Sequence, residues 1–242
     1  MTHPIAISAR ARSESQMQSA EVEQQGFAIL PEVLKSSDVD RLDKSLTDTA
    51  LPRSRAGMRH ALKHPTVLAI AREPRLLAIA QHVLGPCAFP FKATLFDKSP
   101  ISNWLVVWHQ DTALPLRERR ELPEWGPWSV KDGVVCAHAP AEVLPRVVAL
   151  RLHLDDSTPE NGPLRLLRGT HTIGILSDDA IHDLSTRTTA VDCLVPRGGI
   201  LVMRPLVVHA SSKSRSAMRR RVLHIEYAAS VSVADGLELA EA

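Results

Sequence analysis

The sequence is poor in cysteine. Its three cysteines, Cys87, Cys136 and Cys193, are widely spaced, odd in number and outside any paired motif. This pattern argues against a disulfide framework and against a structural zinc site. We interpret the three residues as apolar thiols in a reducing compartment.

The sequence also lacks a long apolar run, a secretion signal and an excess of charge of one sign. Charge, proline or histidine interrupts every long hydrophobic stretch, so no segment reaches the length of a membrane span. No apolar core or small-residue cleavage site follows Arg10 and Arg12 near the start. The net charge is +2, with basic residues scattered apart from 219–221. We therefore expect a cytoplasmic protein without a membrane or nucleic-acid partner; the oligomeric state stays open.

The length and the remaining composition are those of an ordinary globular protein. The 242 residues suffice for one well-buried domain and are too few for two comfortable ones. Hydrophobic residues make up 44% and charged residues 23% of the chain. We expect a single domain over 1–242, with a flexible tail or a frayed helix at 1–24, a helical layer at 25–85 and a β-rich core at 86–230.

The N-terminal third has the pattern of one strand followed by helices. Residues 26–30 read as a short strand, and Ser36 or Ser37 can cap a helix that follows it. A second helix is predicted from Pro65 to Leu84, because apolar residues recur there at helical spacing until Gly85 and Pro86.

After Pro86 the pattern changes to short apolar runs separated by turn residues. Such a pattern is typical of an antiparallel sandwich or barrel. Asn161-Gly162 predicts a hairpin, because a tight turn needs a positive φ that these residues adopt readily. Short strands behind a helical layer favour a jelly roll of the cupin-like kind. The predicted strands are 93–97, 104–108, 133–137, 147–154, 164–167, 188–195, 200–203 and 221–228.

Three residues form a candidate metal site. His109 and Asp111 close a predicted strand two positions apart, so their side chains point to the same side. His209, which follows Val207-Val208, is the best candidate for a third ligand. Two imidazoles and one carboxylate leave three positions open on an octahedral ion, as ferrous iron requires. A His-x-Asp tripeptide alone is more often a surface pair, so the downstream context decides.

The downstream context is a serine and an arginine. Ser211 follows His209 by two residues and Arg220 follows it by eleven. A guanidinium can grip the far carboxylate of 2-oxoglutarate with two hydrogen bonds, and a hydroxyl can add a third. Side chains alternate between the two faces of a strand, so Arg220 points to the opposite face from Arg219 and Arg221. We interpret Arg219 and Arg221 as a solvated basic edge.

Together these motifs resemble those of the phytanoyl-CoA dioxygenase family, which includes ectoine hydroxylase. The resemblance covers roughly residues 91–229, and its motifs are the Trp-His-Gln-Asp at 108–111, the Asn-Gly-Pro-Leu at 161–164, the Gly-Thr-His at 169–171, and the His-Ala-Ser at 209–211 followed by the arginine at 220.

The resemblance implies a double-stranded β-helix and a non-haem iron(II) dioxygenase. It implies iron ligation by His109, Asp111 and His209, and 2-oxoglutarate contacts from Ser211, Arg220 and Thr94. The reaction it implies uses O2, hydroxylates an unactivated C–H bond of a small organic substrate, and releases succinate and CO2. Hydroxylation is favoured over halogenation, because a carboxylate ligand leaves no position for a halide.

Several features stay open. Residue 168 is arginine where relatives usually have proline. The insert from Arg117 to Asp132 has no counterpart in better-known members and is a hypothetical substrate lid. Arg151 and His153 face either the pocket or solvent. The four tryptophans at 104, 108, 125 and 128 either wall a substrate pocket or pack in the core. The remaining histidines are interpreted as structural or surface residues.

Two other functions compete with the dioxygenase. One is a non-catalytic jelly-roll module that binds 2-oxoglutarate or a related small acid. The other is a cupin-like metalloenzyme that uses another metal without 2-oxoglutarate. The sequence does not identify the substrate.

Overall fold

The computed structural model describes residues 19–47 and 57–242. None of the helices within these residues is long and apolar enough to cross a membrane.

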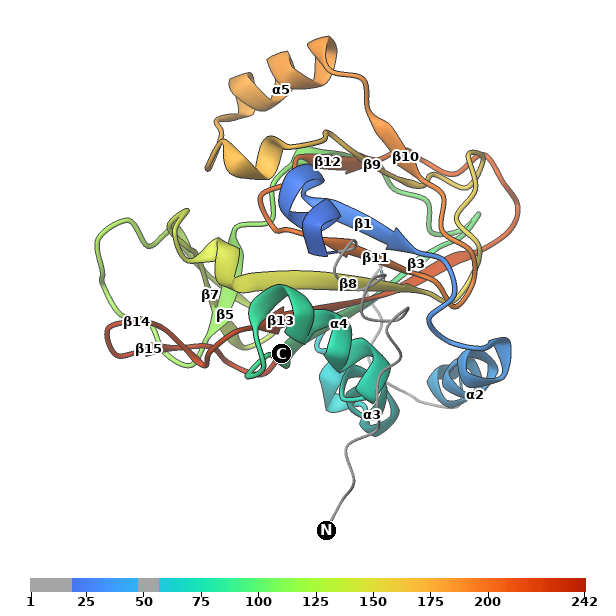
Figure 1. Ribbon diagram of the computed structural model, residues 1–242, viewed down its shortest axis with the longest axis horizontal. Helices are drawn as coiled ribbons and strands as arrows, with labels where there is room; N and C mark the ends of the chain where they lie inside the picture. Colours follow the sequence, from blue (N-terminus) through green and yellow to red (C-terminus); the bar gives the residue numbers. More distant parts are fainter. Residues whose placement is uncertain (1–18, 48–56) are drawn as a thin grey trace.

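A large antiparallel sheet runs through the middle of the molecule (Figure 1). Its strand order is β1-β11-β8-β13-β3-β2, so strands far apart in sequence lie side by side. The strands are β1 (Phe27–Leu30), β2 (Gly57–Met58), β3 (Phe89–Lys98), β8 (Val147–His153), β11 (Ile200–Met203) and β13 (Arg220–Ala228).

A second sheet lies over one face of the large one (Figure 1). Its order is β10-β9-β12-β4, with β4 (Val106–His109), β9 (Leu164–Leu166), β10 (Val191–Cys193) and β12 (His209–Ser211). Two facing antiparallel sheets and a helical layer form the predicted jelly roll. The predicted fold class is therefore confirmed, because the chain crosses repeatedly from one sheet to the other.

The two faces of the large sheet carry different side chains. In β8, Val148, Leu150 and Leu152 are buried in the core against the helices. Arg151 belongs to the other face of this strand and borders the space between the two sheets. Successive residues of a strand point to opposite faces, so one strand can supply both the core and a polar cavity.

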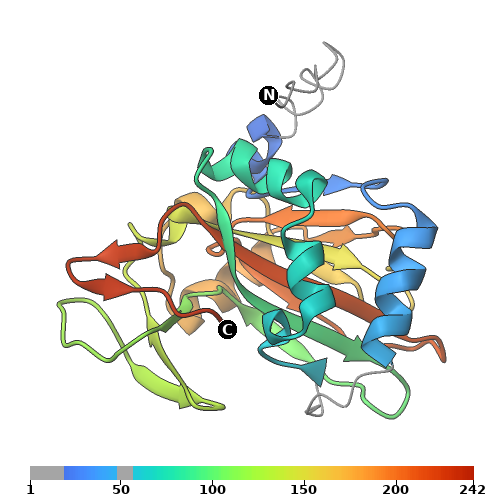
Figure 2. The ribbon, with the colours of Figure 1, turned by 90° about the horizontal axis from the view of Figure 1, so that it is seen from below.

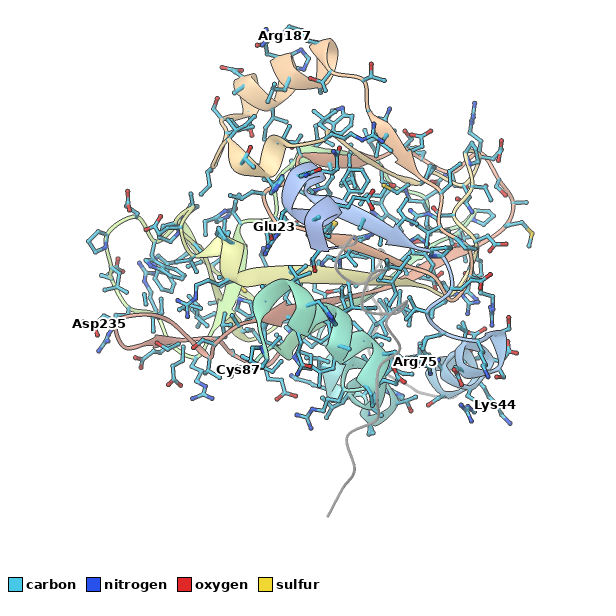
Figure 3. The ribbon with its side chains drawn as sticks, in the orientation of Figure 1. Glu23, Lys44, Arg75, Cys87, Arg187 and Asp235 are labelled. Atoms are coloured by element: carbon cyan, nitrogen blue, oxygen red, sulfur yellow. The ribbon has the colours of Figure 1, made fainter. Side chains whose placement is uncertain are left out.

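Three helices cover the outer face of the large sheet, and Figure 2 shows them lying across its strands. They are α2 (Ser36–Thr47), α3 (Pro65–Ala71) and α4 (Pro74–Leu84). Helix α2 buries the three apolar residues at 39, 42 and 46, and the carbonyl of Lys35 accepts its first backbone hydrogen bonds. Arg75 of α4, labelled in Figure 3, links to α2 through Asp38 at 3.0 Å.

The prediction of one helix from Pro65 to Leu84 was wrong, because the chain forms two. Proline has no backbone N–H to donate, and it disfavours helical geometry in the residue before it. Pro74 therefore begins a new helix, and the carboxylate of Glu73 accepts hydrogen bonds from the backbone of Arg75 and Leu76.

The predicted tail at 1–24 is only partly within the described residues. Residues 1–18 lie outside them, whereas 19–25 form a helix that packs Val22 into the core. Of the two expected alternatives, a helix is the one found for 19–25, because the apolar side chain of Val22 packs against the core.

The insert Arg117–Asp132 contributes one strand to a third sheet. Its order is β5-β7-β6, formed by β5 (Ala113–Leu116), β6 (Trp128–Lys131) and β7 (Val134–His138). Trp125 is buried in a separate apolar cluster beside this sheet. Among the described residues, none from the insert borders the cavity between the two main sheets, so the lid stays a hypothesis.

The remaining elements lie at the periphery. Helix α5 (Asp178–Arg187) lies beyond the second sheet, and β14 (Ser232–Ala234) pairs with β15 (Leu237–Glu238) (Figure 1). Short 3-10 helices occupy Ala61–Lys63, Leu144–Arg146 and Thr170–Thr172.

The Asn161-Gly162 turn does not make a hairpin. Gly162 has the expected positive φ of 67°. However, the flanking strands β8 and β9 belong to different sheets. The turn therefore carries the chain across the jelly roll, a connection that local sequence cannot distinguish from a hairpin.

Candidate active site

A cavity of about 210 Å³ opens between the two main sheets. This volume lies below the roughly 300–1,000 Å³ typical of ligand pockets. The cavity is lined by Lys92, Thr94, Phe96, Lys98, Trp104, Val106, His109, Asp111, Arg151, Leu164, His209, Ser211, Arg220, His224 and Glu226. We call the lining residues of β3, β8 and β13 the cavity floor.

The three predicted metal ligands lie together at this cavity. One donor atom from each of His109, Asp111 and His209 lies within 4.8 Å of the others. Strands β4 and β12 pair with His109 directly opposite His209, which brings the distant residues into contact. The Nε2 atoms of the two histidines lie 3.6 and 3.5 Å from the Asp111 carboxylate. These distances are too long for hydrogen bonds, so the groups converge on a space rather than on one another.

The backbone fixes the orientation of both imidazoles. The Nδ1–H of His109 donates to the carbonyl of Val107 at 2.8 Å, and that of His209 donates to Val207 at 2.9 Å. Each ring therefore keeps the Nε2 lone pair directed toward Asp111. Hydrogen bonds of this kind commonly orient histidines that bind metals.

Charge and burial favour the ligand forms of these groups. Burial lowers the pKa of His209 to about 4, against the opposing effect of the Asp111 carboxylate, so the imidazole is neutral at pH 7. Enclosure would raise the pKa of Asp111, but the surrounding histidines and Lys92 outweigh it and lower the pKa. The site thus offers two imidazoles, of which His209 is neutral at pH 7, and one carboxylate.

Ser211 and Arg220 lie at the other end of the cavity. The Ser211 hydroxyl donates to the carbonyl of Gly162 at 2.9 Å, and Arg220 lies 3.4 Å from its oxygen. The Nε–H of Arg220 donates to the carbonyl of Asn161 at 3.2 Å. Burial and Arg151 lower the pKa of Arg220 to about 10, so it stays charged at pH 7. The Asn-Gly turn therefore holds both residues.

Of the three consecutive arginines, Arg220 was expected to point into the cavity. It is 5% exposed and lines the cavity, as expected. Arg219 pairs with Asp97 at the surface. Arg221 was wrongly expected at a solvated edge, because it pairs with Asp43 and Asp155 between the sheet and α2.

Lys98 is a cavity residue that the sequence interpretation did not assign. It is 1% exposed, and its ammonium donates to the Ser211 hydroxyl at 2.9 Å and to the Ser212 carbonyl at 2.6 Å. Burial, Arg220 and Arg151 lower its pKa to about 7. In the sheet, Lys98 lies directly opposite Arg220. Two cationic groups therefore meet beside one hydroxyl.

Thr94 also lines the cavity, midway along β3 and opposite His224. His224 and Glu226 were not assigned to the cavity from the sequence, although both are buried and line it. The signal was available, since residues at even positions of β13 share the face of Arg220. Register across the sheet then places Lys92 opposite Glu226.

The residues left open at 151 and 153 are both buried, so neither faces solvent. Arg151 lines the cavity, whereas His153 does not. Of the four tryptophans, only Trp104 borders the cavity within the described part of the chain.

A family comparison agrees with this geometry. The family model described as phytanoyl-CoA dioxygenase matches residues 22–222. The chain belongs to the phytanoyl-CoA dioxygenase family. The resemblance inferred from the motifs is therefore confirmed.

Two curated relatives of this family member are named for a small molecule. L-proline trans-4-hydroxylase of Streptomyces griseoviridis is 27% identical over 184 residues, covering 65% of this chain and 61% of the relative. Ectoine dioxygenase of Sphingopyxis alaskensis is 26% identical over 208 residues, covering 76% and 58%. The chain thus spans about six tenths of the length of these relatives.

Solved structures share the fold of this family member. EctD from S. alaskensis, with 2-oxoglutarate and 5-hydroxyectoine, superposes with a TM-score of 0.68 at 21% identity, covering 96% of this chain and 79% of EctD. The epimerase SnoN, in complex with Fe³⁺, α-ketoglutarate and nogalamycin RO, gives 0.69 at 16% identity, covering 90% and 84%. At these identities the likeness shows the fold.

Proposed function

We propose that this chain is a non-haem iron(II)- and 2-oxoglutarate-dependent dioxygenase. It hydroxylates an unactivated C–H bond of a small organic substrate and releases succinate and CO2. The observation that carries the proposal is the convergence of His109, Asp111 and His209 on one space, with both Nε2 atoms directed into it.

The donor set suits iron(II). Two neutral imidazoles and one carboxylate on one face of an ion leave positions free for a bidentate keto acid and O2. Iron bound there would supply the activation of O2 against the keto acid. Because Asp111 provides the carboxylate donor, no position is vacated for a halide, and hydroxylation is the favoured outcome.

The opposite end of the cavity suits the far carboxylate of 2-oxoglutarate. Arg220 offers a planar guanidinium, Lys98 an ammonium and Ser211 a hydroxyl, all buried and close together. Charge-assisted hydrogen bonds of this kind are roughly twice as strong as neutral ones. Thr94 lines the same cavity and is a further candidate contact for the co-substrate.

The volume of the cavity limits the part of the substrate that enters it to a small group. The cavity measures about 210 Å³ and also has to hold the co-substrate. The relatives named for proline and ectoine act on small molecules, which supports the same class here. Lining residues come from both sheets, so the protein can position one C–H bond of the substrate beside the metal ligands.

Substitution of the carboxylate donor tests the proposal. Wild-type protein purified without oxygen is expected to bind iron(II) stoichiometrically and to form succinate from 2-oxoglutarate only when iron is present. Asp111→Ala is expected to lose both properties, because the vacated position leaves two monodentate donors. Metal content is measured by mass spectrometry and succinate by chromatography.

Asp235→Ala is the matched control, since Asp235 is exposed and remote from the cavity. Succinate formation by Asp111→Ala at the wild-type rate would contradict the proposal. Binding of 2-oxoglutarate by the wild type without any consumption of oxygen would favour the non-catalytic module instead. A bound metal with no effect of Arg220→Ala on keto-acid binding would favour a metalloenzyme that does not use 2-oxoglutarate.

A further inference from the structure

Arg151 is a buried cation in the cavity without an anionic partner among the described residues. It is 7% exposed, and its Nη1 donates to Nδ1 of His224 at 3.0 Å. Its Nε atom is buried and has no hydrogen-bond partner in the described part of the chain. Burying such a charge costs free energy unless a counter-ion or ligand compensates it.

A chain of hydrogen bonds holds Arg151 in place. Since His224 accepts from Arg151 at Nδ1, its proton lies on Nε2, which donates to Glu226 at 3.2 Å. Lys92 in turn contacts the same Glu226 oxygen at 2.7 Å. Glu226 is therefore occupied by contacts with Lys92 and His224, and Arg151 makes no direct ion pair with it.

An aromatic ring packs beside the guanidinium. The Cζ atom of Arg151 lies 5.3 Å from the centroid of the Phe96 ring, in the range of a cation–π contact. The group is thus oriented before any ligand arrives, which lowers the entropic cost of binding one.

The charges of the cavity remain unbalanced after the proposed metal and co-substrate are counted. Four cationic side chains and two carboxylates line it. Iron(II) adds two positive charges and 2-oxoglutarate adds two negative charges, so the excess of two positive charges persists. Lys92 is matched by Glu226, whereas Lys98 and Arg220 share the far carboxylate of 2-oxoglutarate. Arg151 is the cation left unmatched.

We propose that Arg151 binds a carboxylate of the substrate, so that the enzyme acts on a small organic acid. This inference rests on the function proposed above and deepens it. Arg151 lies on the cavity floor directly opposite His224 of β13. A carboxylate held there is the group that orients the substrate within the cavity.

The first experiment compares acids with their amides. Wild-type protein with iron(II) and 2-oxoglutarate is assayed for succinate in the presence of a panel of small amino acids and hydroxy acids, each beside its carboxamide. Members of the acid set are expected to stimulate succinate formation and their amides are not. A panel in which no acid stimulates, or in which amides do so equally well, would overturn the proposal.

The second experiment uses Arg151→Met, Arg151→Lys and the surface control Arg219→Met. For the stimulating acid, calorimetry under nitrogen measures binding to protein loaded with manganese(II) and 2-oxoglutarate. Arg151→Met is expected to weaken that binding by about tenfold to a hundredfold, since one bidentate charged pair is lost. The affinity of Arg151→Lys for the acid is expected to lie between those of the wild type and Arg151→Met, and the affinity of Arg219→Met is expected to match that of the wild type.

Binding of 2-oxoglutarate itself separates the explanations. Arg151→Met is expected to change that affinity by less than about threefold, because Lys98, Ser211 and Arg220 remain. An equal loss of 2-oxoglutarate and acid binding would mean that Arg151 serves the co-substrate and would overturn the proposal. If circular dichroism shows that Arg151→Met does not fold, the same comparison of acid binding with 2-oxoglutarate binding is made with Arg151→Lys. Failure of the proposed function would look different, since wild-type protein would then show no iron-dependent use of 2-oxoglutarate.

Discussion

Lys98, Ser211 and Arg220 form a compact group whose chemistry depends on a single proton. The lysine ammonium and the guanidinium both lie beside the Ser211 oxygen, at 2.9 and 3.4 Å. Burial with a second cation makes the charged form of Lys98 costly, and this is why its pKa falls to about 7. An anion bound between them would favour the charged form again.

This arrangement predicts a pH-dependent affinity for 2-oxoglutarate. Lys98 is protonated below its pKa of about 7 and neutral above it. Binding of a carboxylate selects the protonated form, so the dissociation constant is expected to rise as the pH increases from 7 to 9. Calorimetry across this range, with manganese(II) in place of iron, measures the effect.

Lys98→Met supplies the comparison. The variant is expected to bind 2-oxoglutarate more weakly at pH 6.5 than the wild type and to lose the rise between pH 7 and 9. A dissociation constant that rises equally in both proteins would assign the pH dependence to another group.

At the scale of an element, the Asn161-Gly162 turn determines the position of the co-substrate anchors. Its two carbonyls accept from Arg220 and from Ser211. The Asn161 side chain stabilises the turn: its amide N–H donates to the carbonyl of Asp156, and its amide oxygen accepts from the backbone N–H of Thr158. A change in the turn therefore moves both anchors together.

Gly162→Ala is expected to weaken 2-oxoglutarate binding as well as stability. Gly162 has a φ of 67°, and a Cβ added there would lie 2.3 Å from the backbone carbonyl oxygen of Ser212. Gly133→Ala is the matched control, because its φ of 82° imposes a similar strain while no atom lies within 4 Å. That control is expected to cost about 1–2 kcal/mol of unfolding free energy.

Urea unfolding and the Michaelis constant for 2-oxoglutarate separate the two effects. The Michaelis constant is expected to rise in Gly162→Ala and to stay at the wild-type value in Gly133→Ala. Equal values in both variants would show that the turn does not position the anchors.

At the scale of the whole molecule, one sheet separates the functional cavity from the stabilising core. Tyr227 and Glu226 are neighbours in β13 that face opposite sides. Glu226 borders the cavity, whereas Tyr227 is fully buried under the helices, where its hydroxyl donates to the carbonyl of Ala71 at 2.7 Å. The bond ties the end of α3 to the sheet.

Tyr227→Phe is expected to lower the unfolding free energy by about 1–3 kcal/mol, because a buried carbonyl loses its donor. At a temperature well below the unfolding midpoint, the Michaelis constant for 2-oxoglutarate is expected to remain unchanged. Urea titration and steady-state kinetics measure the two quantities. A raised Michaelis constant in this variant would mean that the two faces of the sheet are not independent.

The sequence by itself determined the fold class, the family and the residues that were later found together at the cavity. Alternation along strands and short motifs at fixed spacing are local properties, and they identified His109, Asp111, His209, Ser211 and Arg220 as a candidate group. Their assigned roles as ligands and anchors stay predictions. The same alternation placed Arg220 on one face of its strand and Arg219 on the other.

Only the tertiary structure decided which strands lie opposite one another. Strand register brings Lys98 beside Arg220 and links Arg151 to Glu226 through His224. Arg151 and His224 are 73 positions apart in sequence, and Lys98 and its hydrogen-bond partner Ser211 are 113 apart. The sequence also could not show that the Asn-Gly turn crosses between sheets or that the insert contributes a strand to a third sheet. The physical reason is that a local pattern sets which face a side chain occupies, whereas pairing between distant strands sets which neighbour it meets.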